Sequence, residues 1–453
     1  MSHSLAPLQK EERETRSTAL RRCFSQGQLA SAIDLGAWLQ NGAGDGPVSS
    51  NQPSQDLPFQ RWFKFKEAFS PHLVVDLIRS LPYRATSCLD PFGGSGTTAL
   101  ACQFLGISPI TIEVNPLLAD VIEAKLHSYD PSAVMRDIRS IRTAAANTSS
   151  GVRGLAEGCP QTLCEPGRNG RWIFSKDLFR HIASYRGVIS GLSSSAHRRL
   201  FSVLLASVLV EISNVVVNGK GRRYRAGWRR RQKGPIDLDD AFERACQAVV
   251  FDIVRYQSRA CSQYTLLRGD SRKLLPQVRE ADLVLFSPPY PNSFDYTDIY
   301  NVELWTMGYL SSSQGNRHLR EHTLRSHVQI RRAYDEAPES SKTLRQTLRS
   351  LCRQEGKLWN LDIPGMVGSY FADLSDILQQ CAKLITRRGQ LACVVGDSRY
   401  ANVLIPVATV LSELAPSLGL RVIEAVPIRA MRSSAQQGGR DNLGEVLLRL
   451  ARQ

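Results

Sequence analysis

The pattern of polar and apolar positions sets the first 58 residues apart from the rest of the chain. Residues 1–58 are mostly polar, with a single helical pattern near residues 20–39 and a Gly/Ser/Asn/Pro-rich stretch after it. This pattern predicts an N-terminal arm and linker over residues 1–58. No internal repeat with a period of about 20–50 residues is visible.

From residue 59 onward, apolar runs of strand length alternate with helical patterns. The first helix is expected over 72–80, where Ser70 suits the N-cap and Pro71 the first turn. About seven strands alternate with helices, which predicts an α/β fold with a mostly parallel, doubly wound sheet. The predicted strands are 86–89, 110–112, 266–270, 283–286, 390–395, 421–427 and 444–450. The other helices of this region are predicted over 99–105, 368–384 and 403–414.

Two segments interrupt the alternation of strands and helices. The first insertion, residues 131–261, is helical and basic, and the second insertion, residues 311–364, is polar. We therefore predict one α/β domain from 59–130 and 262–453, with the second insertion inside it. The elements predicted in the first insertion are an apolar helix over 196–217, a basic loop over 219–234 and an amphipathic helix over 238–256.

The chain has 453 residues, with 57 Lys and Arg against 42 Asp and Glu, a net charge of +15. This excess favours a polyanionic partner, although charge alone does not separate DNA from RNA or an anionic membrane. No apolar run reaches the ~18 residues of a spanning helix, and the charged N-terminus lacks the apolar core of a secretory signal. The ten cysteines include no CxxC, which favours reduced thiols in a cytoplasm over a zinc site or a disulfide framework.

A glycine-rich loop, Asp90–Thr98, follows the first predicted strand and contains three glycines within four residues. Glycine permits a sharp turn and a close approach of the backbone to a ligand. Glu113 stands at the end of the next strand, where a carboxylate can accept both ribose hydroxyls. The loop has no Lys after its last glycine and no full GxGxxG, so it is neither a Walker A loop nor a complete dinucleotide site. An adenosine-containing ligand is indicated.

The loop sequence DPFGGSGTT resembles the DPFxGSGTT motif with which amino-methylating DNA methyltransferases bind S-adenosyl-L-methionine. The tetrapeptide SPPY, Ser287–Tyr290, resembles the catalytic tetrapeptide of that family, and residues 66–77 resemble the motif that precedes its loop. The resemblance covers about 62–130 and 264–450, and it implies a Rossmann-like AdoMet-dependent methyltransferase fold. The cofactor-binding residues expected on these grounds are Phe69, Ser70, Asp90, Pro91, Phe92, Gly93, Gly94, Ser95, Gly96, Thr97, Thr98, Glu113 and Asp270.

Three of these positions have specific expected roles. Asp90 is placed to meet the ammonium group of the methionine moiety, with the backbone of residues 92–94 along the same part of the cofactor. Asp270 sits where the family places a residue near the adenine ring. An N-cap or a turn residue beside Gly269 is an equally good interpretation of Asp270 from the sequence.

The tetrapeptide fits methyl transfer to an exocyclic amine, which is a poor nucleophile because its lone pair is delocalised into the ring. The Ser287 hydroxyl and the Pro288 carbonyl can accept the N–H hydrogens, freeing the lone pair and stabilising the developing positive charge. Pro288 and Pro289 restrict the backbone, and Tyr290 offers a ring on which an extruded base can stack. Direct in-line transfer needs no covalent intermediate, in agreement with the absence of cysteine from the motif. The structural alternative is a rigid turn at the end of a strand.

By the same resemblance, serine at the first position favours cytosine N4 over adenine N6. The expected function is therefore a site-specific DNA methyltransferase that acts on a flipped base. Adenine-N6 and RNA N-methyltransferases and a non-catalytic DNA-binding subunit stay open as alternatives. The resemblance also implies a prokaryotic restriction–modification or defence setting, a cytoplasmic, nucleoid-associated protein, and a cognate restriction endonuclease or defence-system subunit as partner.

The basic segment 219–234 has eight Lys or Arg residues and no acid, with aromatic residues interleaved. Guanidinium groups bind phosphates and can donate bidentate hydrogen bonds to guanine in the major groove. We predict contact with double-stranded DNA, the alternative being a solvated basic loop. The predicted DNA-binding residues are Lys220, Arg222, Arg223, Arg225, Trp228, Arg229, Arg230 and Arg231.

The second insertion contains three histidines, of which His318 and His322 are four residues apart. Glu321 points away from the face that these two share on a helix, and no cysteine completes a ligand set. We therefore expect no metal site here and favour a polar recognition or packing element.

Overall fold

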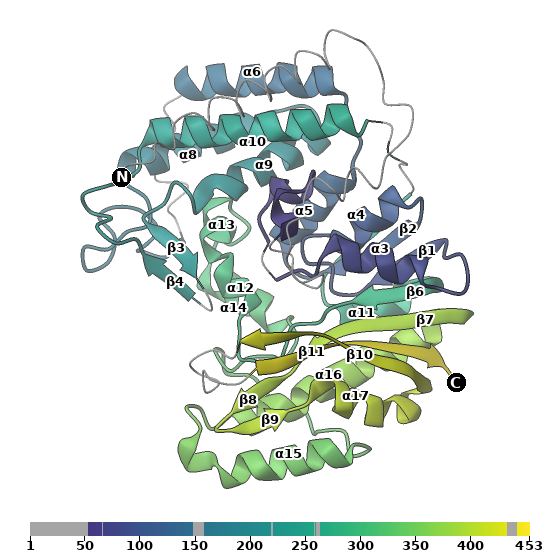
Figure 1. The fold of residues 1–453 in the computed structure, drawn as a ribbon. Coiled ribbons are helices and arrows are strands. Elements are labelled where there is room, and N and C mark those ends of the chain that lie inside the picture. The colour runs from purple at the N-terminus through teal and green to yellow at the C-terminus, as the bar shows by residue number, and fades with distance from the viewer. Residues whose placement is uncertain are drawn as a thin grey trace, which may run out of the picture.

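Seven strands form the central sheet of the molecule (Figure 1). The computed structural model describes residues 53–65, 67–147, 158–218, 221–257, 259, 263–432 and 442–453. In sheet order the strands are β10, β11, β7, β6, β1, β2 and β5, and only β11 runs against the others. The predicted α/β fold with a mostly parallel sheet is confirmed. The strands are β1 (Ser87–Asp90), β2 (Ser108–Glu113), β5 (Thr265–Arg268), β6 (Ala281–Phe286), β7 (Ile385–Gly396), β10 (Leu420–Arg432) and β11 (Asn442–Arg452).

The two faces of the sheet are covered by different helices (Figure 1). Because side chains alternate along a strand, Leu283 and Leu285 of β6 join the core shared with α3, α4 and α5. Val284 and Phe286 join the core shared with α16 and α17. Burial on both faces explains why β6 is almost wholly apolar. The helices are α3 (Pro71–Arg79), α4 (Thr97–Phe104), α5 (Pro116–Leu126), α16 (Ile363–Leu384) and α17 (Val407–Leu414).

The strand order reverses direction between β1 and β6. From β1 the chain moves outward through β2 to β5, then returns to β6 and moves outward the other way to β7. In open α/β sheets, ligands bind in the crevice outside the carboxyl ends of the strands at such a point. Asp90 ends β1 and Ser287 follows β6, so the fold brings the two predicted motifs to one crevice.

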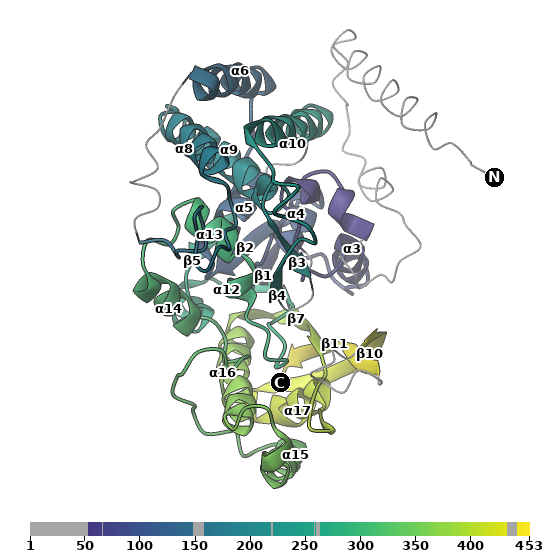
Figure 2. The same ribbon diagram turned by 90° about the vertical axis from the view of Figure 1, so that its left-hand side faces the viewer.

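Four helices of the first insertion form a layer beyond α5, at the opposite end of the molecule from α15 to α17 (Figure 2). Helix α9 packs against α5, and α8 and α10 pack against α9. The layer is held by apolar side chains that are continuous with the core on that face of the sheet. Its helices are α6 (Pro131–Asn147), α8 (Lys176–Ser190), α9 (Ser195–Leu209) and α10 (Pro235–Arg255).

The helix predicted over 196–217 is shorter than expected, because α9 ends at Leu209. Residues Val215–Asn218 form strand β3 instead, which pairs antiparallel with β4 (Gly221–Tyr224). The three consecutive valines of β3 favour extended backbone, since branching at Cβ restricts χ1. The basic segment predicted as a loop therefore begins as a strand. Lys220, Lys66 and the helix predicted near 20–39 lie outside the described residues.

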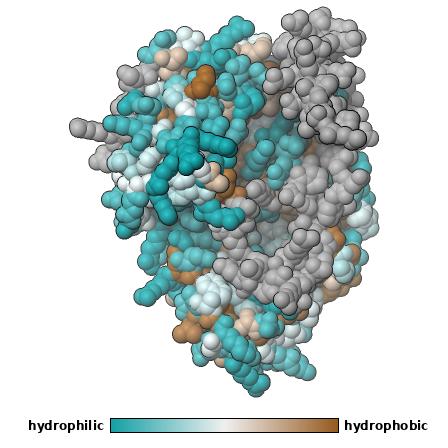
Figure 3. Space-filling model, turned by 60° about the vertical axis from the view of Figure 1, so that its left-hand side comes forward, coloured by the Kyte–Doolittle hydropathy of each residue, from teal (hydrophilic) through white to brown (hydrophobic). Residues whose placement is uncertain are grey.

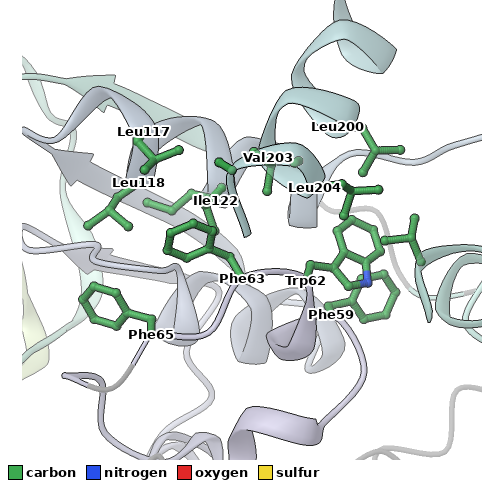
Figure 4. Packing of buried hydrophobic residues seen from close by; sticks show 14 of the residues in the cluster. Phe59, Trp62, Phe63, Phe65, Leu117, Leu118, Ile122, Leu200, Val203 and Leu204 are labelled. Atoms are coloured by element: carbon green, nitrogen blue, oxygen red, sulfur yellow. The ribbon is translucent and has the colours of Figure 1, made fainter. Parts of the chain in front are cut away.

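The chain just before α3 joins the core on one face of the sheet to the helical layer. Phe59, Trp62 and Phe63 are at most 2% exposed, and they pack among side chains of α5 and α9 (Figure 4). The buried Asp252 carboxylate on α10 accepts hydrogen bonds from the Phe59 amide and the Trp62 indole, both at 2.8 Å. This segment contains the short 3₁₀ helices η1 (Pro53–Asp56) and η2 (Gln60–Trp62).

The second insertion and the C-terminal part contain short elements. The helix predicted over 403–414 begins only at Val407, after Pro406, because residues 403–405 form the strand β9 of a small hairpin. Among the described residues, no helix is long and apolar enough to cross a membrane. The remaining elements are β8 (Ser398–Tyr400), β9 (Val403–Ile405), α11 (Ser271–Leu274), α12 (Tyr296–Ile299), α13 (Asn301–Thr306), α14 (Ser313–Glu321), α15 (Lys342–Arg353), η3 (Leu275–Gln277), η4 (Glu355–Lys357) and η5 (Ala415–Leu418).

Candidate active site

A cavity of about 410 Å³ lies at the carboxyl ends of β1, β2 and β6 and contains both predicted motifs in its walls. A volume of this order is typical of small-molecule sites. Ser70 and Gly96 are the two predicted cofactor residues that do not line it: Ser70 caps α3 by accepting from the His72 amide at 3.2 Å, and Gly96 is the N-cap of α4. The predicted residues in the wall are Phe69, Asp90, Pro91, Phe92, Gly93, Gly94, Ser95, Thr97, Thr98, Glu113, Asp270, Ser287, Pro288, Pro289 and Tyr290.

The glycine loop has a backbone that side chains would disrupt. A Cβ on Gly93 would lie 2.3 Å from Cγ2 of Thr111, closer than real Cβ contacts come. Gly94 and Gly96 have φ values of 52° and 81°, in the left-handed region that favours glycine. The three glycines thus let the loop fold tightly against β2.

Glu113 at the end of β2 ties the loop to the next helix. Its Oε2 accepts a hydrogen bond from the Gly94 amide and its Oε1 accepts one from the Asn115 amide, both at 2.7 Å. The side chain is buried, and this burial raises the pKa of Glu113 to about 7 although the two amides oppose the shift. The carboxyl therefore titrates near neutral pH.

Asp90 is the second buried acid of the cavity. Its Oδ1 accepts a hydrogen bond from the Phe92 amide at 2.9 Å, and burial raises the pKa of its carboxyl to about 6. Ser95 and Thr97, in the same wall, have buried hydroxyls without a hydrogen-bond partner among the described residues. Buried polar groups are nearly always paired. Two acids and two unpaired hydroxyls around one cavity fit a polar, cationic cofactor such as S-adenosyl-L-methionine.

Asp270 lines the cavity and also has a structural role. Its carboxylate caps α11 by accepting from the Arg272 amide at 3.0 Å, and it pairs with the Arg272 guanidinium at 2.8 Å. The other side of that guanidinium pairs with Asp373 of α16 at 2.7 Å. The N-cap interpretation of Asp270 is thus observed, and a contact with the adenine ring stays a prediction.

The tetrapeptide after β6 is linked to a residue that the sequence motifs did not indicate. The Ser287 hydroxyl donates to the Tyr290 hydroxyl at 3.3 Å, which donates to Oε1 of Glu445 at 2.8 Å. Glu445 is on β11, is only 3% exposed and lines the same cavity. Burial and the nearby Glu445 carboxylate raise the pKa of Tyr290 well above its usual value, so its phenol stays protonated.

The second insertion closes the cavity on the tetrapeptide side. Asp295 caps α12 by accepting from the Thr297 amide at 3.0 Å, and it pairs with Arg320 of α14. His327 lines the cavity, and burial lowers its pKa to about 4, which keeps the imidazole neutral at neutral pH. The described residues contain no group of three or more His, Cys, Asp or Glu that could hold a metal ion.

The basic segment presents its arginines in two ways. Arg225 is turned inward, where its guanidinium donates to the carbonyls of Ser213 and Val210 at 3.0 and 2.8 Å. Trp228 packs edge-on against Trp172 with ring centroids 4.9 Å apart. These contacts hold the segment in place, and the DNA contact predicted for Arg225 and Trp228 stays a prediction. The arginines exposed to solvent are Arg222, Arg223, Arg229, Arg230 and Arg231.

Two of the exposed arginines, Arg222 and Arg223, lie on β4 near the active-site cavity. Strand β4 contacts α12, the helix that follows the tetrapeptide loop. Figure 3, turned so that the side with β3 and β4 in Figure 1 comes forward, shows mainly hydrophilic side chains where the surface is coloured, with apolar residues scattered singly or in small groups. A polar, arginine-rich surface beside the cavity is suited to a phosphate backbone.

Comparison with known proteins agrees with this site. The family model of N6/N4 methyltransferases, described as DNA methylase, matches residues 13–124. Type II methyltransferase M.AvaI from Nostoc sp. is 28% identical over 436 residues, covering 86% of this chain and 85% of the relative. Type II methyltransferase M.BsoBI from Geobacillus stearothermophilus is 24% identical, covering 94% of this chain and 93% of the relative.

Among solved structures, the rRNA methyltransferase aviRa from Streptomyces viridochromogenes is 12% identical, covers 84% of this chain and 85% of its own, and has a TM-score of 0.29. This likeness is too weak to support any conclusion. The sheet order and the cavity agree with the Rossmann-like AdoMet-dependent methyltransferase fold expected from the sequence. The family model and these two relatives support an amino-methylating DNA methyltransferase that uses S-adenosyl-L-methionine as its cofactor.

Proposed function

We propose that this protein methylates the exocyclic N4 amine of cytosine at a specific DNA sequence, after the base has been extruded from the duplex. The observation that carries this proposal is the single cavity shared by the glycine loop and the Ser287–Tyr290 tetrapeptide. An amine that enters this cavity between Ser287 and the loop meets hydrogen-bond acceptors on one side and the cofactor site on the other.

The cofactor would be held by the two buried acids and the loop. S-adenosyl-L-methionine, when bound, supplies an electrophilic methyl group on a sulfonium. The Asp90 carboxylate is suited to the ammonium of its methionine part, and the Glu113 carboxylate to the ribose hydroxyls. Each acid sits at the end of its own strand, β1 or β2, and each is held by backbone amides, so both are preorganised before the cofactor arrives.

The tetrapeptide would prepare the amine for attack. The Ser287 hydroxyl and the Pro288 carbonyl accept its two N–H hydrogens, which draws the nitrogen toward tetrahedral geometry and localises its lone pair. The same acceptors stabilise the positive charge that nitrogen gains in the transition state, and such differential stabilisation is what accelerates a reaction. Serine at the first position supports cytosine as the base, by resemblance to enzymes of that kind.

The position of the cavity supports extrusion of the base. The cavity is recessed at the strand ends and closed on one side by the second insertion, so an amine inside an intact base stack does not reach it. Enzymes that modify bases take the target out of the stack at a cost of about a few kcal/mol. The exposed arginines of residues 222–231 would hold the flanking phosphates while the base is out.

The setting follows from the relatives. Two proteins matched over most of their length are named type II methyltransferases, which supports a role in a prokaryotic restriction–modification system, with a cognate endonuclease as partner and a cytoplasmic location near the nucleoid. The net charge of +15 is consistent with a nucleic-acid substrate.

The test is to incubate the protein with methyl-labelled S-adenosyl-L-methionine and unmethylated plasmid DNA, then digest the DNA and identify the nucleosides by mass spectrometry. N4-methylcytosine is the expected product. Detection of N6-methyladenine would show that adenine is the target base in place of cytosine. Label in structured RNA but not in DNA would overturn the proposal. Ser287→Ala should lose turnover severely while binding the cofactor as before; an active variant would disprove the role of Ser287.

A further inference from the structure

Ser287, Tyr290 and Glu445 form a hydrogen-bonded chain that runs from the reaction side of the cavity into the protein. The donor at each step is fixed: Ser287 donates to Tyr290 at 3.3 Å, and Tyr290 donates to Glu445 at 2.8 Å. All three side chains belong to residues that line the cavity. The chain therefore connects the predicted acceptor for the amine with a buried carboxylate.

We propose that Glu445 is the positioning residue for Ser287 and the final acceptor of the proton that the amine loses, with Tyr290 as the relay between them. This inference rests on the proposed function, because it concerns the same methyl transfer. It adds a residue on β11 to a site for which the sequence predicted no residue after β7.

The orientation of the Ser287 hydroxyl is the first consequence of the chain. A hydroxyl has one proton to donate and two lone pairs that can accept. Because the proton of Ser287 is used in the bond to Tyr290, its lone pairs remain available to accept one N–H hydrogen of the amine, while the Pro288 carbonyl accepts the other. Without this bond the hydroxyl can rotate and point its proton at the amine nitrogen, which would occupy the lone pair that must attack.

The route of the proton is the second consequence. Once the nitrogen carries the methyl group it is cationic, and one N–H bond must break. The Ser287 oxygen takes that proton while its own proton passes to the Tyr290 oxygen, and the proton of Tyr290 passes to Oε1 of Glu445. The products are a neutral methylated amine and a neutral Glu445, so atoms and charge balance, and Ser287 and Tyr290 end as they began.

The position of Glu445 fits this role better than a packing role. Because β11 is antiparallel to β7, its first residues lie at the edge where the parallel strands end, and Glu445 is paired with Gly396 at the end of β7. A carboxylate buried to 3% exposure is costly unless it is hydrogen-bonded. Tyr290, whose high pKa keeps it a donor, supplies such a bond.

The test is single-turnover methylation of unmethylated plasmid DNA by the wild-type protein and by Glu445→Gln and Tyr290→Phe. Each variant should slow the methyl-transfer step by about 100-fold, which is the scale of general acid–base effects, and should leave the dissociation constants for cofactor and DNA unchanged. The double variant should be no slower than the slower single variant, because both changes break one chain.

A matched control is Glu424→Gln on β10, which removes a carboxylate of the same hairpin that pairs with Arg449 outside the cavity. It should keep the wild-type rate. A Glu445→Gln variant at the wild-type rate, or single losses that multiply in the double variant, would overturn the relay. Thermal unfolding of each variant separates loss of folding from loss of rate. If the wild-type protein transfers no methyl group to DNA, the proposed function fails, and the relay fails with it.

Discussion

The buried Glu113 should make cofactor affinity depend on pH near neutrality. Its pKa is about 7 in the protein without cofactor, against 4.5 for an ordinary glutamate. At about 1.36 kcal/mol per pKa unit, keeping the ionised form costs on the order of 3 kcal/mol at this position. If Glu113 accepts from the ribose hydroxyls as proposed, the cofactor requires the ionised carboxylate, and protons compete with the cofactor for Glu113.

The size of the effect follows from the titration. If only the ionised form binds, the apparent dissociation constant rises by a factor of one plus the ratio of protonated to ionised carboxyl. With a pKa of about 7, this factor is roughly 2 at pH 7 and roughly 10 at pH 6. Asp90, with a pKa of about 6, steepens the dependence at still lower pH.

Glu113→Gln should reproduce the low-pH protein at every pH. Both carboxylate oxygens now accept from backbone amides, of Gly94 and Asn115. In the Gln variant, the side-chain NH₂ group would face one of these backbone amides, as would the carboxyl proton of a neutral Glu113. That backbone N–H would then have no acceptor, at a cost of about 1–3 kcal/mol. Weak binding without pH dependence between about pH 6.5 and 8 is therefore expected.

Isothermal titration calorimetry with S-adenosyl-L-methionine from pH 6 to 8 is the measurement. Glu123→Gln is the control, since Glu123 pairs with Arg199 and Arg268 outside the cavity; it should titrate like the wild type. A wild-type affinity that stays constant over this range, or a Glu113→Gln protein with the wild-type slope, would refute the reasoning. Folding stability should change in the opposite sense, falling as pH rises from about 4.5 to 7, because the folded state holds this proton more tightly.

Three further outcomes are expected. Gly93→Ala should abolish cofactor binding measured by calorimetry, because its Cβ would meet Thr111 at 2.3 Å. Replacing the three arginines at 229–231 by Gln should weaken DNA binding in a filter assay and lower its salt slope by up to about 2.7, whereas Arg139→Gln on α6 should not; an unchanged slope would exclude 229–231 from the interface. Burial lowers the pKa of Lys125 to about 7, so wild-type stability to urea should rise from pH 7 to 10, and Lys125→Met should remove that rise.

The parts of the site that could be predicted from the sequence are local in the chain. The glycine loop and its acid follow from adjacent residues, because the tight turn at Gly93 and the amide pair around Glu113 are made within one βαβ unit. The tetrapeptide is also contiguous. For the same reason each of the seven sheet strands was predicted at its place in the chain, with ends that differ by up to five residues, whereas helix α5 was not predicted.

The parts that could not be predicted depend on long-range placement. Glu445 is 155 residues from Tyr290, and only the reversed direction of β11 brings them together. Arg225 is one of a run of similar arginines, and nothing in that run marks it as the one whose guanidinium binds the end of α9. The valines of β3 continue an apolar helical pattern, so the change to a strand is set by its pairing with β4.

The aromatic segment ahead of α3 has a practical consequence for how this protein can be cut or recombined. Phe59 and Trp62 donate hydrogen bonds to Asp252 on α10. The side-chain nitrogen of Lys125 donates both to the Gln60 side chain and to the Ser95 carbonyl in the glycine loop. A truncated protein that starts at α3 would lose these aromatic side chains, and a graft of the helical layer alone would lose their matching partners. Either change would expose the hydrophobic core and also weaken the support of the glycine loop. Chimaeras between relatives should therefore carry residues 53–65 together with the helical layer from the same parent.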